Sequence, residues 1–295
     1  MDKRALMNSK SRPVNGVKTG RNSTIRPLFL PHHIFTVLWR DRVLVSELAT
    51  REFKSLYRTS LLGIGWAFLN PLLSLAVYTL VFGLVMKVRW QAETKNIDEF
   101  ALILFTGLIV FYFFADCLTR APGLMLENVN YIKKIKFPLE IMPWVVVIGA
   151  LIKAMVSLII LLVAIIVLHG APPWTAIFLP LVFLPLLLFA LAVGWLLSSI
   201  GVYIRDLAQI VTPLVTLMFF ISPVFYPVSA MPGALRYFLY VNPVTFIIEQ
   251  TRDVLLAGVM PNFPGLLVYS ILAWLAAWVA LLWFSQTKRG FSDVI

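Results

Sequence analysis

Residues 141–168 read IMPWVVVIGALIKAMVSLIILLVAIIVL, and Lys153 is the one charged residue among them. This apolar run exceeds the roughly 20 residues that an α-helix needs to cross the hydrocarbon core of a bilayer. It shows no alternation with a period of two, which a membrane-spanning β-strand would require. The run therefore predicts a transmembrane helix.

Five further apolar runs accompany this one, so we expect an all-α integral membrane protein with six transmembrane helices. Pro213, Pro223 and Pro227 interrupt the fifth run, where neighbouring protein or water must satisfy the backbone groups that proline leaves unbonded. The predicted spans are residues 61–86, 100–118, 141–168, 174–200, 210–226 and 264–284.

The composition of the whole chain agrees with a membrane protein. Of its 295 residues, 60% are hydrophobic and 13% are charged, whereas soluble domains carry about 45–50% apolar and about 25% charged residues. These values exclude a cytosolic enzyme and a disordered regulator. Cys117 is the single cysteine, which excludes an intramolecular disulfide.

The distribution of Lys and Arg predicts the orientation of the spans. The side that holds both termini carries about nineteen of these residues and the other side about five, which places both termini in the cytoplasm. The same bias accounts for the net charge of +11 without any binding of nucleic acid. The first apolar run begins only near residue 61, so the sequence shows no signal peptide.

The N-terminal region divides into two parts. Residues 1–31 are basic and rich in Ser, Asn, Gly and Pro, which predicts a disordered cytoplasmic tail. Residues 32–60 place apolar side chains on one helix face and charged side chains on the other, which predicts an amphipathic helix in the membrane interface. The alternative is a soluble helix that packs on a protein core, and the sequence offers no soluble core.

Motifs for catalysis are missing from the sequence. It contains no nucleotide phosphate loop, no H-E-x-x-H zinc motif and no G-x-S-x-G nucleophile motif, and its acidic residues are scattered. We therefore expect no enzymatic activity and no cofactor or metal bound by this chain.

A set of short motifs occurs in a distinctive order. They are residues 51–66 (REFKSLYRTSLLGIGW) with Asn70-Pro71, residues 128–138 (NVNYIKKIKFP) with Glu140 and Pro143, residues 203–206 (YIRD), residues 222–227 (SPVFYP), Met231-Pro232, Asn242-Pro243, and Glu249 with Arg252. Together these motifs resemble the ABC-2 type permeases that export bacterial cell-surface polysaccharides. The resemblance covers residue 34 to the C-terminus, the domain 61–295 included, and the O-antigen permeases are more similar than those for capsule or teichoic acid. The long basic N-terminal extension departs from the family pattern.

The resemblance implies a transport subunit rather than a complete pump. It implies a homodimer of this chain in the bacterial cytoplasmic (inner) membrane, in contact with membrane lipids and bound to two copies of a separate ABC ATPase that binds the ATP. The implied substrate is a polyprenyl-linked glycan.

The ATPase needs a cytoplasmic docking segment on this chain, and residues 127–138 are the candidate. Their lysines can face acidic groups on the partner, and the interleaved apolar residues can add contact area. The alternative is that these lysines only follow the positive-inside rule. The predicted docking residues are Glu127, Asn128, Tyr131, Ile132, Lys133, Lys134, Lys136 and Phe137.

Four aromatic residues are predicted to line the pore. Ring faces let sugars slide by apolar contact without strong directional bonds, and aromatic residues make up 14% of the chain. For most aromatics near span ends, a place in the interfacial belt is the better interpretation. The predicted pore residues are Trp66, Tyr112, Phe219 and Tyr226.

Two further pairs of charged residues attract attention. Lys153 lies near the middle of the third predicted span, so we expect it to face the pore or to pair with Asp116 on the neighbouring span. The alternative is that the span is misplaced and Lys153 lies near its true end. The resemblance implies a re-entrant periplasmic hairpin before the last span, built from residues 233–240 and 245–257. Glu249 and Arg252 lie there with i, i+3 spacing and can pair on one helix face.

Two other functions stay open. One is an ABC-2 type permease for small molecules or drugs. The other is a secondary transporter that needs no ATPase, which would usually show more intramembrane charges and internal hydropathy repeats than this sequence does.

Overall fold

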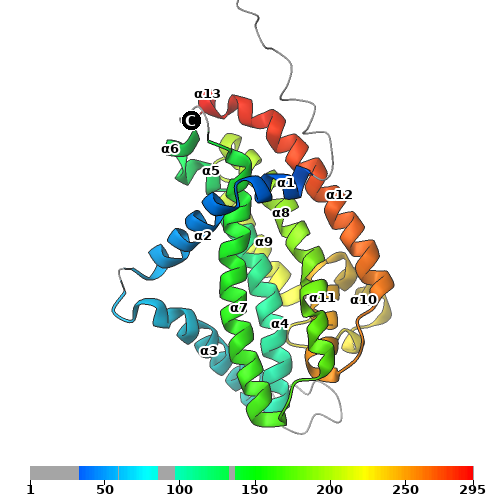
Figure 1. Ribbon diagram of the computed structural model, residues 1–295. Helices are drawn as coiled ribbons and strands as arrows, with labels where there is room; N and C mark the ends of the chain where they lie inside the picture. Colours follow the sequence, from blue (N-terminus) through cyan, green and yellow to red (C-terminus); the bar gives the residue numbers. More distant parts are fainter. Residues whose placement is uncertain (1–32, 59, 86–96, 133–136, 295) are drawn as a thin grey trace, which may run out of the picture.

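The computed structural model describes residues 33–58, 60–85, 97–132 and 137–294. Every regular element in these residues is helical, which confirms the all-α fold. The predicted tail, residues 1–31, lies outside the described residues. The longer helices (Figure 1) are α1 (His33–Arg40), α2 (Arg42–Tyr57), α3 (Trp66–Tyr78), α4 (Ile97–Arg120), α7 (Met142–His169), α8 (Leu179–Tyr203), α9 (Leu207–Ile221), α10 (Gly233–Val241), α11 (Pro243–Arg252) and α12 (Phe263–Thr287).

Five helical stretches in the described residues are long and apolar enough to cross a membrane. They match the first, second, third, fourth and sixth predicted spans, because an apolar run of this length leaves its backbone groups few alternatives to helical bonding in lipid. The chain is thus a multi-pass membrane protein. The five stretches are Gly63–Phe82, Ile97–Arg120, Leu139–His169, Trp174–Tyr203 and Phe263–Val294.

The fifth predicted span has different bounds from those expected. The predicted run is 210–226, whereas helix α9 is a shorter apolar helix of 15 residues that ends at Ile221. Ser222 is extended, with φ −67° and ψ 143°, because the residue before a proline is disfavoured in the helical region and Pro223 follows. Residues 222–226 therefore form a turn instead of the last turn of a span.

Helix α4 is the central helix of the bundle. Of the 18 residues that form the apolar segment of α4, 78% are buried inside the protein. The corresponding share for the stretch that contains α3 is 6%. Helix α4 packs against α7, α8, α9 and α11, and α12 runs along α8. Figure 1 shows α2 and α3 standing off to one side of this bundle.

Glycine permits one especially close contact between helices. A Cβ on Gly201 of α8 would overlap the carbonyl oxygen of Pro122 and lie 3.0 Å from the Pro122 Cα. Pro122 belongs to the turn that follows α4, so only a residue without a side chain lets α8 approach that turn.

The predicted N-terminal amphipathic helix is divided into two helices that pack on protein. Asp41, with φ −107° and ψ 19°, separates α1 from α2. The apolar residues Ile34, Val37, Val45 and Ala49 are almost fully buried, with α2 packed on α7 and α1 touching α12. The membrane-spanning bundle itself thus provides the core that the sequence did not reveal.

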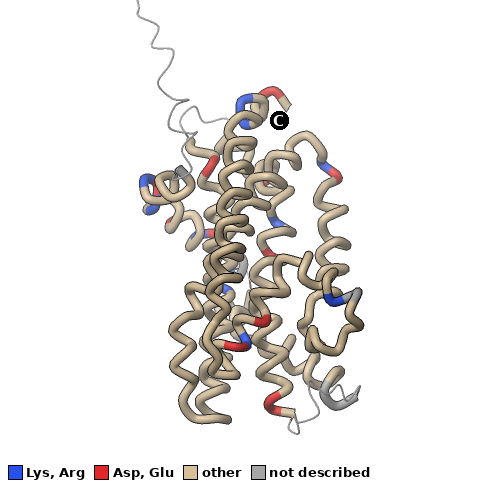
Figure 2. Tube along the Cα trace, turned by 90° about the vertical axis from the view of Figure 1, so that its right-hand side faces the viewer, with Lys and Arg blue, Asp and Glu red and all other residues tan. Residues whose placement is uncertain are grey.

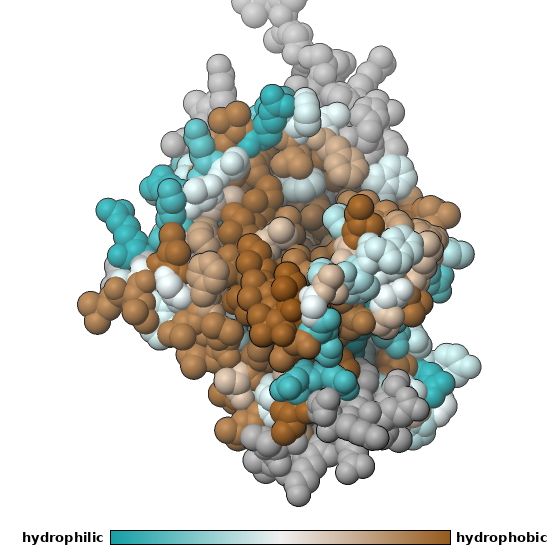
Figure 3. All heavy atoms as spheres, turned by 60° about the horizontal axis from the view of Figure 1, so that its bottom comes forward, coloured by the Kyte–Doolittle hydropathy of each residue, from teal (hydrophilic) through white to brown (hydrophobic). Residues whose placement is uncertain are grey.

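The surface separates charged from apolar side chains. Figure 2 shows most Lys and Arg residues toward the end of the bundle where the C-terminus lies. Glu52 of α2 pairs there with Arg120, and Lys288 at the end of α12 pairs with Glu140. Apolar side chains cover a broad area of the face seen in Figure 3, as expected for a surface in contact with lipid.

Candidate functional site

A charged pair lies inside the membrane-spanning part of the bundle. The Nζ atom of Lys153 on α7 donates to Oδ2 of Asp116 on α4 over 2.9 Å. The structure thus brings together the two residues that the sequence offered as an intramembrane pair. Both side chains keep some exposure, 32% for Lys153 and 24% for Asp116, so the pair is not sealed in the core.

A cavity of about 520 Å³ explains this exposure. It lies between α3, α4 and α7, and both members of the pair line it. The other polar residues of its lining are uncharged: Asn70, Ser74, Tyr112, Thr119 and Ser157. Because α3 is sparsely packed, this cavity has one wall that contributes little to the core.

Two of the predicted pore aromatics belong to one cluster beside the cavity. The rings of Tyr112 and Phe219 stack with centroids 6.0 Å apart, and the Tyr112 hydroxyl donates to the Tyr78 hydroxyl over 3.2 Å. Phe225 completes the cluster, 5.0 Å from Phe219. Tyr112 is 40% exposed and lines the cavity, so it joins the aromatic cluster to the charged pair.

Of the other two predicted pore residues, Trp66 lies apart from this cluster and Tyr226 directly follows its member Phe225. Trp66 is the first residue of α3 and precedes Tyr78 by twelve positions, which separates them by about 18 Å along the helix. Tyr226 follows the end of α9, and its hydroxyl bonds to the carbonyl oxygens of Phe220 (3.0 Å) and Ile221 (2.7 Å). The Tyr226 hydroxyl therefore satisfies carbonyls that the end of the helix leaves without helical partners.

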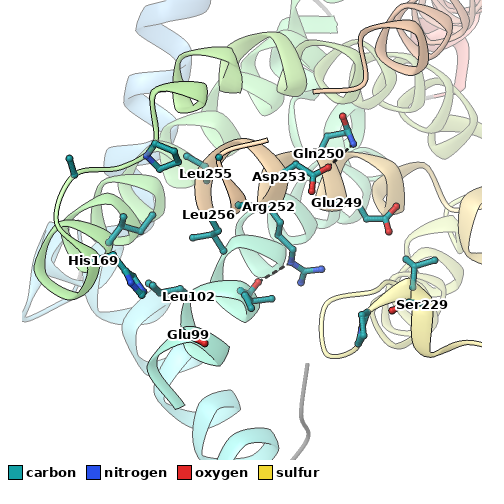
Figure 4. Close-up of a pocket in the computed structure, with 18 residues that line it drawn as sticks. Glu99, Leu102, His169, Ser229, Glu249, Gln250, Arg252, Asp253, Leu255 and Leu256 are labelled. Carbon is teal, nitrogen blue, oxygen red and sulfur yellow. Dashed lines mark hydrogen bonds between the residues drawn. The ribbon is translucent and has the colours of Figure 1, made fainter. Parts of the chain in front are cut away.

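Arg252 performs the same task for the next residues of the turn. This side chain of α11 is buried and bonds to the carbonyl oxygens of Pro223 (2.7 Å) and Val224 (3.0 Å), and to that of Ile103 on α4 (3.1 Å). Figure 4 shows it reaching from α11 toward α4. One guanidinium thus joins α11, α4 and the turn after α9, because its donors form a fixed planar fork.

Asn242 strengthens this connection from the start of α11. Its amide nitrogen donates to the Ser222 hydroxyl over 2.8 Å, and its amide oxygen accepts from the backbone of Val244 over 3.1 Å. The motifs at 222–227, Asn242-Pro243 and Arg252, which are distant in sequence, therefore meet in one network. Sequence reasoning missed this network, because Arg252 lies well beyond the proline-broken apolar run in the sequence and only the fold brings the two together.

Glu249 lies on the same helix but contacts a different partner. Its carboxylate accepts from the Tyr240 hydroxyl on α10 over 2.9 Å. Burial raises the pKa of Glu249, and burial together with this hydrogen bond raises the pKa of Tyr240 to about 12. The contact joins α10 to α11, the two helices formed by the amphipathic pieces that the sequence placed before the last span.

A second cavity, of about 860 Å³, opens beside this network. Glu99, Glu249 and Asp253 line it together with Arg252 and His169 (Figure 4). Burial raises the pKa of Asp253. Three acidic residues and one arginine lie in this lining, so the cavity is unsuited to an anionic ligand.

The predicted docking segment is described in part. Helices α5 (Leu124–Glu127) and α6 (Val129–Ile132) precede residues 133–136, so Lys133, Lys134 and Lys136 lie outside the described residues. Glu127 is exposed, and the Asn128 amide donates to the carbonyl of Leu124 over 2.9 Å. The rings of Tyr131 and Phe137 stack at 4.4 Å, and Ile132 is half-buried.

Comparison with known proteins relates this architecture to a family. Residues 43–256 match the family of ABC-2 type transporters. The chain is 31% identical over 260 residues to the O-antigen export system permease protein RfbA of Myxococcus xanthus, covering 88% of this chain and 97% of that protein.

More distant relatives agree with this match. The O-antigen export system permease protein RfbA of Klebsiella pneumoniae is 25% identical over 253 residues, 85% of this chain and 95% of that protein. The polysialic acid transport protein KpsM of Escherichia coli is 26% identical over 225 residues, 74% of this chain and 83% of that protein. The chain belongs to the family of ABC-2 type transporters.

Proposed function

We propose that this chain is the transmembrane subunit of an ABC transporter that exports a lipid-linked cell-surface polysaccharide of the O-antigen type. The observation that carries the proposal is the similarity to an O-antigen export permease along nearly the whole length of that relative. The polar cavity and aromatic cluster inside the bundle support it, because a glycan needs both hydrogen-bonding groups and ring faces within the membrane.

The energy for export comes from a partner in this proposal. The chain has no nucleotide phosphate loop, so a separate ABC ATPase, present in two copies, binds and hydrolyses the ATP. The ATPase docks on residues 127–138, where Tyr131, Ile132 and Phe137 supply apolar contact and Lys133, Lys134 and Lys136 supply charge.

The assembly we propose is a homodimer in the bacterial inner membrane. Both termini lie in the cytoplasm, since the basic residues gather at the end of the bundle that holds the C-terminus (Figure 2). Helix α9 is the remaining, sixth span, and α10 and α11 form the re-entrant periplasmic hairpin. The exposed apolar faces of α3 and α9 are available to lipid or to the second copy.

The function is tested by deleting the gene and measuring surface polysaccharide together with intracellular lipid-linked glycan. We expect surface polysaccharide to disappear and the lipid-linked glycan to accumulate inside the cell, with both reversed by the wild-type gene. The purified chain should bind an ABC ATPase and hydrolyse no ATP alone. Normal surface polysaccharide in the deletion strain, or robust ATP turnover by the isolated chain, would overturn the proposal.

A further inference from the structure

The Lys153–Asp116 pair lies within the membrane-spanning part of the bundle. Lys153 follows the first residue of α7, Met142, by eleven positions, which corresponds to about 16 Å along the helix axis. Asp116 precedes the last residue of α4, Arg120, by four positions, or about 6 Å, so the pair lies within a hydrocarbon core of about 30 Å, in the half nearer the C-terminal end of α4. A charged group at such a depth is costly unless it has water or a partner.

Packing of the helices alone does not explain the pair. Apolar residues of similar volume replace buried ion pairs at no cost in stability in many proteins. Helices α4 and α7 pack against each other, and both carry buried apolar residues such as Leu108, Val147 and Ala150. We therefore look for the role of the pair in the cavity that both side chains line.

The cavity can bind an anionic ligand at Lys153, whereas Asp116, which also lines it, repels an anion. The Lys153 ammonium has three N–H donors, and the bond to Asp116 uses one of them. Asn70, Ser74 and Ser157 add uncharged hydrogen-bonding groups to the lining. Asp116 competes with any incoming anion, so an anion binds when Lys153 exchanges its carboxylate partner for the ligand.

The wall formed by α3 allows a ligand to enter from the side. Only 6% of the apolar segment in the stretch Gly63–Phe82, which contains α3, is buried. Pro71 also lines the cavity, and it weakens α3 there because it lacks the N–H that would bond to the carbonyl of Ala67. Few contacts therefore oppose a displacement of α3 away from α4 and α7.

We propose that this cavity is a transient site for an anionic group of the transported molecule, a phosphate or a sugar carboxylate. Lys153 is the counter-charge of the anion, and the ion pair between Lys153 and Asp116 forms again when the anion leaves. The proposal rests on the proposed function, since it names the part of the exported glycolipid that the bundle recognises. The exchange keeps Lys153 paired throughout, while the Asp116 carboxylate that it releases is left to the uncharged polar groups of the lining, so Asp116 opposes binding and binding stays transient.

Binding of amphiphilic probes tests the proposal. The complex with its ATPase is placed in nanodiscs of phosphatidylcholine and titrated with decyl phosphate, octyl glucuronide or octyl glucoside. The phosphate and the glucuronide distinguish the two sources of the anion, and the neutral glucoside is the control. We expect at least one anionic probe to bind more tightly than the glucoside.

Two substitutions should change this affinity in opposite directions. Lys153→Gln should weaken binding of the anionic probe by about 10-fold, the value of one charged hydrogen bond, and Lys153→Arg should restore it. Asp116→Asn removes the competitor and should tighten binding. If the pair had only a structural role, Lys153→Gln and Asp116→Asn would lower the melting temperature by similar amounts. Both variants would then also bind the anionic probe with similar affinity.

Several results would overturn the site without affecting the proposed function. They are equal affinity for the glucoside and both anionic probes, unchanged anion binding in Lys153→Gln, or weaker binding in Asp116→Asn. Wild-type export of the glycan in cells is measured separately, so the proposed function fails only if that export is absent.

Discussion

The guanidinium of Arg252 lies directly against Gly107: a Cβ on residue 107 would come within 2.6 Å of the Arg252 Nη2 atom and 3.4 Å of the Val224 Cα. Gly107 is in the middle of α4, so this glycine makes space on the central helix for the arginine that joins three elements. The packing of α11 against the bundle thus depends on the absence of a side chain at residue 107.

Gly107→Ala should destabilise the protein by about 1–3 kcal/mol, as overpacking of a filled core does. The methyl group displaces the guanidinium and breaks its bonds to the carbonyls of Pro223 and Val224. Thermal unfolding in detergent, with export measured in cells, checks this.

Gly149→Ala on α7 is the matched control. The nearest heavy atom to a Cβ there, Nη1 of Arg120, is 3.9 Å away, so the alanine fits and should be neutral or slightly stabilising. Equal melting temperatures for the two variants would contradict the close contact.

Arg252→Lys should fail to replace arginine. A lysine ammonium cannot reach three carbonyls in the planar arrangement that the guanidinium uses, and buried carbonyls left unbonded cost about 1–3 kcal/mol each. We expect a lower melting temperature and faster proteolysis near residues 222–226. Arg236→Lys, at an exposed residue with a single bond to the Ser229 carbonyl, should change neither measurement.

Tyr226→Phe separates a structural role from a pore role. If Tyr226 only offered a ring face to the glycan, phenylalanine would be tolerated. The structure gives the hydroxyl two carbonyl partners, so we expect phenylalanine to lower stability by about 0.5–1.5 kcal/mol, the net value of a typical hydrogen bond. Tyr237→Phe, at a residue that is 79% exposed, provides the comparison; identical stability of both variants would remove the structural role.

Tyr112 and Phe219 should act as one unit in export. Because their rings stack, the effects of Tyr112→Ala and Phe219→Ala on surface glycan per folded transporter should be non-additive, with a coupling of about 0.5–1.5 kcal/mol. Trp66→Ala lies far along α3 and should combine additively with either. Additive effects for all three pairs would contradict a shared aromatic surface.

The docking segment makes a separate prediction. Reversing the charges of Lys133, Lys134 and Lys136 together should weaken binding of the ATPase, while one reversal does little because an exposed pair contributes about 0–1 kcal/mol. Co-purification of the ATPase with each variant measures this. Arg289→Glu, at the same end of the bundle, is the control for general charge; normal binding by the triple variant would leave the lysines as a topology signal only.

Hydropathy predicted the spans well because their cause is local. The run 141–168 must be helical in lipid whatever surrounds it, and the structure has a helix there. Proline chemistry is local as well, yet the fifth predicted span ends at residue 226, beyond the end of α9 at Ile221. Pro223 lies inside that predicted span, whereas its effect on Ser222 ends the helix.

The site residues depend on packing between distant segments, which hydropathy does not reveal. Whether Tyr112 faces Phe219 or lipid is decided by the rotation of α4 about its axis, and that rotation is set by α7, α8 and α11. The burial of Ile34 and Val45 against the bundle has the same origin. The spacing of Glu249 and Arg252 suggested an isolated pair, but the approach of α4 and the turn after α9 gave Arg252 its three carbonyl partners.

The short length of α9 has a consequence for the lipid around it. Its 15 residues extend about 22 Å, whereas the hydrocarbon layer is about 30 Å thick. If α9 crosses the bilayer as proposed, the membrane beside it must thin, or acyl chains must extend past its end at Ile221, where the Tyr226 hydroxyl already bonds to the exposed carbonyls of Phe220 and Ile221. A thicker bilayer therefore strains this protein first at α9 and the turn after it, and the acyl chain length of the host membrane becomes a variable that export should follow.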